Sequence, residues 1–170
     1  MNQAERRIWL IDALLNERPD GRGVAVPARA SEQRDLLRAL MNVRPPEALA
    51  TEVLNVQDAY LQQRLVERGG ATDARTLPYR NRIAVWRGDI TLLKADAIVN
   101  AANSQMLGCF VPRHRCIDNA IHTYAGMQLR LICAGLMCKQ GHEEPTARVK
   151  VTPAFNLPSS HIFHTVGPIV

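Results

Sequence analysis

The chain has 170 residues, of which 46% are hydrophobic and 22% charged, and its formal net charge is +5. This length and composition predict a globular chain of one domain with an appendage, and exclude a disordered protein. The arginines are scattered and not interleaved with aromatic residues, which argues against a nucleic-acid partner. No segment is apolar enough to span a membrane, so we expect a cytoplasmic protein whose four cysteines are thiols or metal ligands.

The first part of the chain predicts three amphipathic helices, because apolar residues recur there at helical spacing. The first helix ends at Pro19, and the second begins at Ser31 as its N-cap and ends at Pro45. The third should run from Leu49 to Arg68, before a pair of glycines. None of the three carries a catalytic constellation. We therefore interpret residues 1–70 as a helical extension that serves for packing.

The rest of the chain predicts an α/β layer fold. Residues 71–82 are expected to be a polar linker, and residues 83–170 contain short strands interleaved with helices. One or two helices should cover Ile117–Cys138, with a break near Gly126, and the cysteines Cys133 and Cys138 are expected to be buried in them. Four strands are predicted, at Ile83–Trp86, Ala97–Val99, Arg148–Thr152 and Ile162–Val166.

The densest chemistry begins where the second predicted strand ends. Asn100 and Asn103 follow this strand, and in open α/β sheets ligands bind at the carboxyl ends of strands. A carboxamide can both donate and accept hydrogen bonds, which suits the hydroxyls of a ribose, although both residues could also close the loop as Asx turns. Asp118 and Asn119 then open a helix whose N-terminus favours a diphosphate. Asp118 could equally stabilise that helix alone.

Three residues of types that bind metal ions lie between these features. Cys109, His114 and Cys116 are spaced to bind one Zn²⁺. No fourth ligand stands at an obvious spacing in the same loop, which is typical of a catalytic zinc site with an open position. A structural zinc with His122 or Asp118 as the fourth ligand, and a metal-free loop with ordinary thiols, are the alternatives.

Four segments together resemble a macrodomain, and more narrowly the zinc-containing macrodomains that act as protein-ADP-ribose hydrolases in bacteria and fungi. The Cys-Phe-x-Pro-x-His-x-Cys pattern is their most specific part. The helical extension is also similar to the N-terminal extension of that subfamily. The segments are GDIT at Gly88–Thr91, DAIVNAANS at Asp96–Ser104, GCFVPRHRCIDNAIH at Gly108–His122 and HTVGPI at His164–Ile169.

The resemblance implies a macrodomain-like mixed sheet with flanking helices over residues 83–170, plus the N-terminal helical extension. The later strands, the second phosphate loop and the C-terminal helices of the family have no counterpart after Val170, so we expect an incomplete, shortened macrodomain. Where zinc macrodomains usually have a glycine in Thr-Gly-x-Ala-Lys, this chain has Ala147. We expect local distortion at that alanine.

The resemblance also implies roles for single residues. Asp89 would accept a hydrogen bond from the adenine amino group, with Ile90 beside it, although Asp89 could also cap the turn that Thr91 begins. Asn103 would lie near the distal ribose, and Asp118 would position water or ribose, which makes these two the candidate catalytic residues. Asn103, Asp118 and Asn119 would share the binding of ADP-ribose with the adenine contacts.

The function implied is zinc-dependent hydrolysis of mono-ADP-ribose from acidic side chains of modified proteins, with one Zn²⁺ per chain. A lipoyl-carrier protein modified by a sirtuin-type transferase is the candidate target of this hydrolase. Two alternatives stay open at this point. One is an ADP-ribose-binding module with a structural zinc, and the other is an inactive, truncated remnant that exposes apolar sheet surface.

Overall fold

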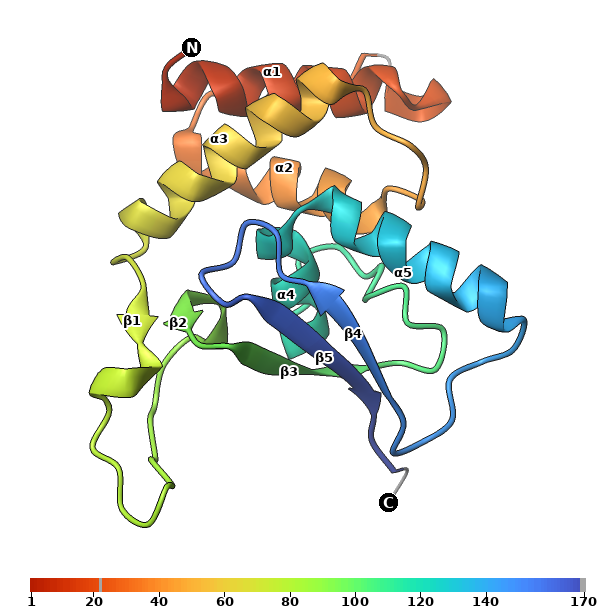
Figure 1. Ribbon diagram of the computed structural model, residues 1–170. Helices are drawn as coiled ribbons and strands as arrows, with labels where there is room; N and C mark the ends of the chain where they lie inside the picture. The colour runs from red at the N-terminus through yellow and green to blue at the C-terminus, as the bar shows by residue number, and fades with distance from the viewer. Residues whose placement is uncertain (22, 169–170) are drawn as a thin grey trace.

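The computed structural model describes residues 1–21 and 23–168 as a mixed α/β structure (Figure 1). A layer of three helices lies at the N-terminal side, and a small sheet with two further helices forms the rest. The longer helices are α1 (Gln3–Asn16), α2 (Ala30–Val43), α3 (Thr51–Glu67), α4 (Ile117–Ala125) and α5 (Met127–Gln140). The strands are β1 (Thr72–Asp73), β2 (Leu93–Lys94), β3 (Ala97–Ala102), β4 (Val149–Pro153) and β5 (His161–Val166).

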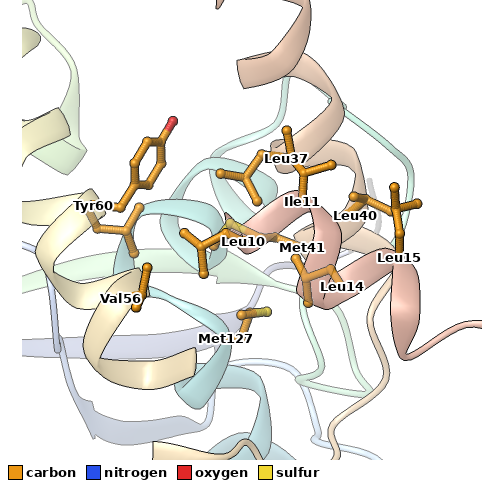
Figure 2. Close-up of a cluster of buried hydrophobic side chains, with 11 residues drawn as sticks. Leu10, Ile11, Leu14, Leu15, Leu37, Leu40, Met41, Val56, Tyr60 and Met127 are labelled. Carbon is orange, nitrogen blue, oxygen red and sulfur yellow. The ribbon is translucent and has the colours of Figure 1, made fainter. Parts of the chain in front are cut away.

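The helical layer has its own apolar core. Leu10 and Ile11 of α1 are almost fully buried, and they meet Leu37 of α2 and Tyr60 of α3 in one cluster (Figure 2). Met127 at the start of α5 joins the same cluster, so the layer rests on the second half of the chain. Burial of such side chains stabilises the fold by about 1.5–3 kcal/mol each.

The main sheet has three strands in the order β3-β5-β4. β5 runs parallel to β3 and antiparallel to β4, with Ile98 opposite Ile162 in the register. One face packs on α4 and α5 through a second apolar cluster that contains Ile98, Ile121 and Ile162. The other face presents Val99 and Phe163, which are exposed.

The predicted break between two helices is confirmed. Gly126 separates α4 from α5 with φ +105°, a backbone conformation that strongly favours glycine. The side-chain amide of Gln57 in α3 accepts a hydrogen bond from the N–H of Met127 at 2.8 Å. The turn is therefore held by the helical layer.

Three sequence predictions were wrong in detail. Residues Ile83–Trp86 form no strand, because Val85 is 90% exposed and Ile83 pairs only with Arg80 across a tight turn. The expected linker instead contains β1, which pairs in parallel with β2. The second helix begins at Ala30, so Ser31 lies in its first turn and is not the N-cap.

Within residues 1–21 and 23–168, no helix combines the length and apolar character needed to cross a bilayer.

Candidate functional site

Asn100 and Asp118 meet beneath the carboxyl end of β3. Asn100 is an inward-facing residue of that strand and is fully buried, so it does not lie in the loop as expected from the sequence. Its Nδ2 donates a hydrogen bond to Oδ1 of Asp118 at 2.8 Å. Burial raises the pKa of the Asp118 carboxyl, and the hydrogen bond from Asn100 opposes part of that rise. The pair holds a carboxyl group in the first turn of α4.

The three predicted metal ligands converge in the loop that leads into α4. The donor atoms of Cys109, His114 and Cys116 all lie within 4.8 Å of one another, and Sγ of Cys109 is 3.5 Å from Nδ1 of His114. Sulfur and nitrogen donors on one tetrahedral Zn²⁺ lie roughly 3.5 Å apart, so the arrangement fits this ion. His114 is exposed and the two cysteines are half-buried, which leaves the cluster open to solvent on one side.

The first turn of α4 is tied to this metal loop, defined here as residues 109–116. Cys116 is the N-cap of α4, and its Sγ accepts a hydrogen bond from the N–H of Asn119 at 3.3 Å. The Asn119 side chain is fully buried and donates to the carbonyl oxygens of Val111 and Cys109 at 3.0 and 3.4 Å. This placement directs the Asn119 side chain into the loop and does not support the ligand contact expected for it.

Asn103 follows the end of β3 and is exposed. Its Nδ2 donates to the carbonyl oxygen of Gly108 at 3.2 Å, which spans the segment before the metal loop. The Asn103 side chain is therefore held near Cys109 while remaining accessible. This position is compatible with the ribose contact expected for it.

Asp89 caps the short 3-10 helix at Ile90–Leu92, as its alternative interpretation predicted. Its Oδ1 accepts hydrogen bonds from the N–H and hydroxyl of Thr91 at 2.9 and 2.7 Å. Its Oδ2 accepts from the guanidinium of Arg68 at 2.5 Å, and that guanidinium stacks over Tyr124 of α4. Burial raises the pKa of Asp89, but the bonds from Thr91 and the charge of Arg68 outweigh it, so the net pKa is lowered. Asp89 is still half exposed, and Ile90 beside it is half-buried.

His122 does not join the metal loop. It lies with Cys133 and His164 in a second, fully buried group of donor atoms within 4.8 Å of one another. Nδ1 of His164 accepts a hydrogen bond from Nδ2 of Asn100 at 3.1 Å, and Nε2 of the same ring donates to Oγ1 of Thr152 at 2.9 Å. Burial raises the pKa of Cys133 to about 12, so its thiol stays protonated. We interpret this group as core polar packing below Asp118.

Three contributors could not be found from the sequence pattern. Arg38 donates to the carbonyl oxygen of His114 at 3.2 Å, and Asn42 accepts from the N–H of Arg113 at 2.9 Å. Arg130 donates to the carbonyl oxygen of Leu107 at 2.7 Å. Arg130 also places its guanidinium 4.1 Å from the ring centroid of Phe110 in the loop. All three residues reach the loop or the segment just before it from distant positions in the sequence, so no local spacing pointed to them.

Residues 99–170 match the family described as Macro domain. A protein-ADP-ribose hydrolase of Treponema medium is 56% identical over 174 residues, which cover 100% of this chain and 67% of that relative. The chain belongs to the macro domain family. A protein-ADP-ribose hydrolase of Staphylococcus aureus (strain MRSA252) is 46% identical over 162 residues, covering 94% of this chain and 60% of the relative. The Trypanosoma brucei macrodomain solved in complex with ADP-ribose is 27% identical, with a TM-score of 0.50 over 76% of this chain and 59% of that one.

This macro domain chain spans 60 to 67% of the length of those two hydrolases. The family match begins inside β3 and includes the metal loop, α4, α5, β4 and β5. The three N-terminal helices lie outside that match, yet they lie within the alignment with the Treponema medium hydrolase. The helical extension is therefore shared with that relative.

Proposed function

We propose that this chain binds zinc and functions as a hydrolase that removes mono-ADP-ribose from acidic side chains of proteins. The observation that carries the proposal is the convergence of Cys109, His114 and Cys116 immediately before the helix whose first turn holds Asp118. The names of the two similar bacterial hydrolases support the reaction class.

Each residue of the candidate site has a proposed role that follows from its position. Zn²⁺ on Cys109, His114 and Cys116 would supply a Lewis acid that polarises an oxygen of the sugar or lowers the pKa of water. Asp118 would accept a hydrogen bond from a ribose hydroxyl or from the attacking water, while Asn100 fixes the direction of its carboxyl group. Asn103 would orient the distal ribose through a carboxamide that donates to Gly108, next to the metal loop.

The reaction is hydrolysis of a ribosyl ester. Water adds its oxygen to the anomeric carbon or to the acyl carbon, the ester bond breaks, and the products are ADP-ribose and the free acidic side chain. The freed carboxylic acid releases its proton at neutral pH. The role of Asp118 as hydrogen-bond acceptor serves either point of attack.

Adenine would bind at Asp89, beside Ile90. A carboxylate that keeps its charge accepts a hydrogen bond from the adenine amino group, and the bonds from Arg68 and Thr91 favour the charged form. An inosine analogue of ADP-ribose lacks that amino group. We expect it to bind roughly 5- to 10-fold more weakly than ADP-ribose, and expect Asp89→Ala to abolish the difference.

The test of the proposal uses a protein carrying ADP-ribose on glutamate or aspartate, with a lipoyl-carrier protein modified by a sirtuin-type transferase as one such substrate. Release of ADP-ribose is measured with the zinc-loaded chain, after chelation, and after zinc is restored. Cys116→Ala should abolish release, whereas Cys138→Ala should not, because Cys138 is an exposed thiol on α5. Tight ADP-ribose binding without any release would instead identify a binding module.

A further inference from the structure

The helical extension reaches the metal loop through one face of α2. α2 lies on the side of the helical layer that faces α4 (Figure 1). Nη2 of Arg38 donates to the carbonyl oxygen of His114 at 3.2 Å and to Oδ1 of Asn119 at 2.7 Å, and Nε donates to the same Oδ1 at 3.2 Å. One guanidinium thus joins the loop to the helix that follows it.

Asn119 connects Arg38 to both ends of the metal loop through further hydrogen bonds. While its Oδ1 accepts from Arg38, its Nδ2 donates to the carbonyl oxygens of Cys109 and Val111, and its N–H donates to Sγ of Cys116. Each of the three metal-ligand residues is therefore bonded to Arg38 or to Asn119. Asn119 is fully buried, so water does not compete for these bonds.

A second contact from α2 fixes the middle of the loop. Arg113 has φ +56°, a conformation sparsely populated by residues other than glycine, which persists only when the surroundings hold it. Its N–H donates to Oδ1 of Asn42 at 2.9 Å, and its side chain pairs with Asp35 at 2.9 Å. Asn42 is almost fully buried and also donates to Thr123 of α4.

We propose that Arg38 is a positioning residue for the metal site, and that α2 is part of that site and not only a packing element. This inference rests on the proposed function in one respect, since it requires that the loop binds zinc. The loop has no helix or strand of its own between Cys109 and Cys116. Its three donors therefore stay convergent only where other elements hold the backbone, and α2 supplies the hold through Arg38.

The test measures zinc affinity of the whole chain by competition with a coloured chelator, together with the cobalt(II) absorption spectrum. Arg38→Met should lower zinc affinity roughly 10- to 100-fold, the range found when groups that orient metal ligands are removed. Arg38→Lys keeps a single charged donor group, so its zinc affinity should lie between that of Arg38→Met and that of the unsubstituted chain. Arg34→Met is the matched control, because Arg34 lies one turn earlier on α2 and lines the groove toward α3. It should bind zinc as the unsubstituted chain does.

A second measurement needs no metal. Trypsin cleaves after Arg113 and Arg115, both exposed in the loop, and its rate reports how well the loop is held. We expect cleavage of the metal-free Arg38→Met chain to be several-fold faster at these sites than in the Arg34→Met control, with unchanged far-UV circular dichroism. Equal zinc affinity and equal cleavage in both variants would overturn the inference and leave the proposed function standing. Failure of the unsubstituted chain to bind zinc would overturn both.

Discussion

Asn100 donates one hydrogen bond to Asp118 at 2.8 Å and lies 3.1 Å from Nδ1 of His164, so a single buried amide connects the first turn of α4 to β5. Asn100 and Asp118 come from β3 and α4, which are separated in sequence by the metal loop. The buried hydrogen bond between Asn100 and Asp118 therefore holds β3 against the first turn of α4. The metal loop is held separately, by Arg38 and Asn42 of α2.

Asn100→Leu should lower the free energy of unfolding and also shift the pH dependence of hydrolysis. The change leaves the Asp118 carboxyl and the His164 ring without their shared donor, and each unsatisfied buried group costs about 1–3 kcal/mol. Since the bond from Asn100 lowers the pKa of Asp118, its loss should move the acidic limb of hydrolysis to higher pH. Urea unfolding and kcat/KM against pH measure the two effects. Asn103→Ala is the contrast, because that exposed residue should weaken ADP-ribose binding and leave stability nearly unchanged.

Acidification should destabilise the chain through two buried histidines. Burial lowers the pKa of His122 to about 3 and that of His164 to about 4, below their ordinary value. Groups with a depressed folded pKa contribute stability above about pH 6.5, and this stability is lost as the pH falls toward the folded pKa. Asp118, whose pKa is raised, acts in the opposite direction and offsets part of the loss.

The two rings together should lower the free energy of unfolding by on the order of 5 kcal/mol on going from about pH 7 to about pH 4.5, before the offset from Asp118. Urea titrations at the two pH values measure it. His122→Gln removes one of the two titrating rings and should reduce the loss by about half. An equal loss in this variant and in the unsubstituted chain would show that His122 is not the source.

The helices were predictable because their signals are local. Apolar residues at helical spacing gave the third helix within two residues of its observed bounds, and Gly126 marked the division between α4 and α5. The predicted strand at Ile83–Trp86 failed because an apolar run forms a strand only with a partner, and none of the described strands pairs with it. β1 and β2 are two residues each, too short to leave a pattern.

In the candidate site too, the features set by local sequence spacing were predictable and those set by long-range contacts were not. Three metal ligands within eight residues converge because the chain between them is short, so their spacing was informative. The contact of Arg38 with Asn119 joins residues 81 positions apart, and no local pattern records it. Cys138 was wrongly expected to be buried with Cys133, because residues five positions apart lie roughly 140° apart around a helix and face different surroundings.

Gly108→Ala should destabilise the loop that leads to Cys109. Gly108 has φ +77°, and an added Cβ would lie 2.7 Å from the His122 ring, so both the backbone and the packing oppose it. We expect a loss of about 1–3 kcal/mol in unfolding free energy and weaker zinc binding. Gly135→Ala is the control, because Gly135 is exposed in α5 and a Cβ there meets nothing within 4 Å. It should stabilise by about 0.4–1 kcal/mol.

Ala147→Gly should stabilise the chain, the opposite of the usual effect of glycine. Ala147 has φ +62°, in the left-handed region that favours glycine, and its N–H donates to the carbonyl oxygen of Val166 at 3.1 Å. The left-handed conformation costs a residue with a Cβ about 1–2 kcal/mol, whereas the added freedom of glycine in the unfolded chain costs about 0.5–1 kcal/mol. The net gain should be roughly 0.5–1 kcal/mol in unfolding free energy, measured by urea titration. Ala134→Gly, inside α5, should instead lose about 1 kcal/mol. A loss of similar size in both variants would mean that the alanine at position 147 is not strained.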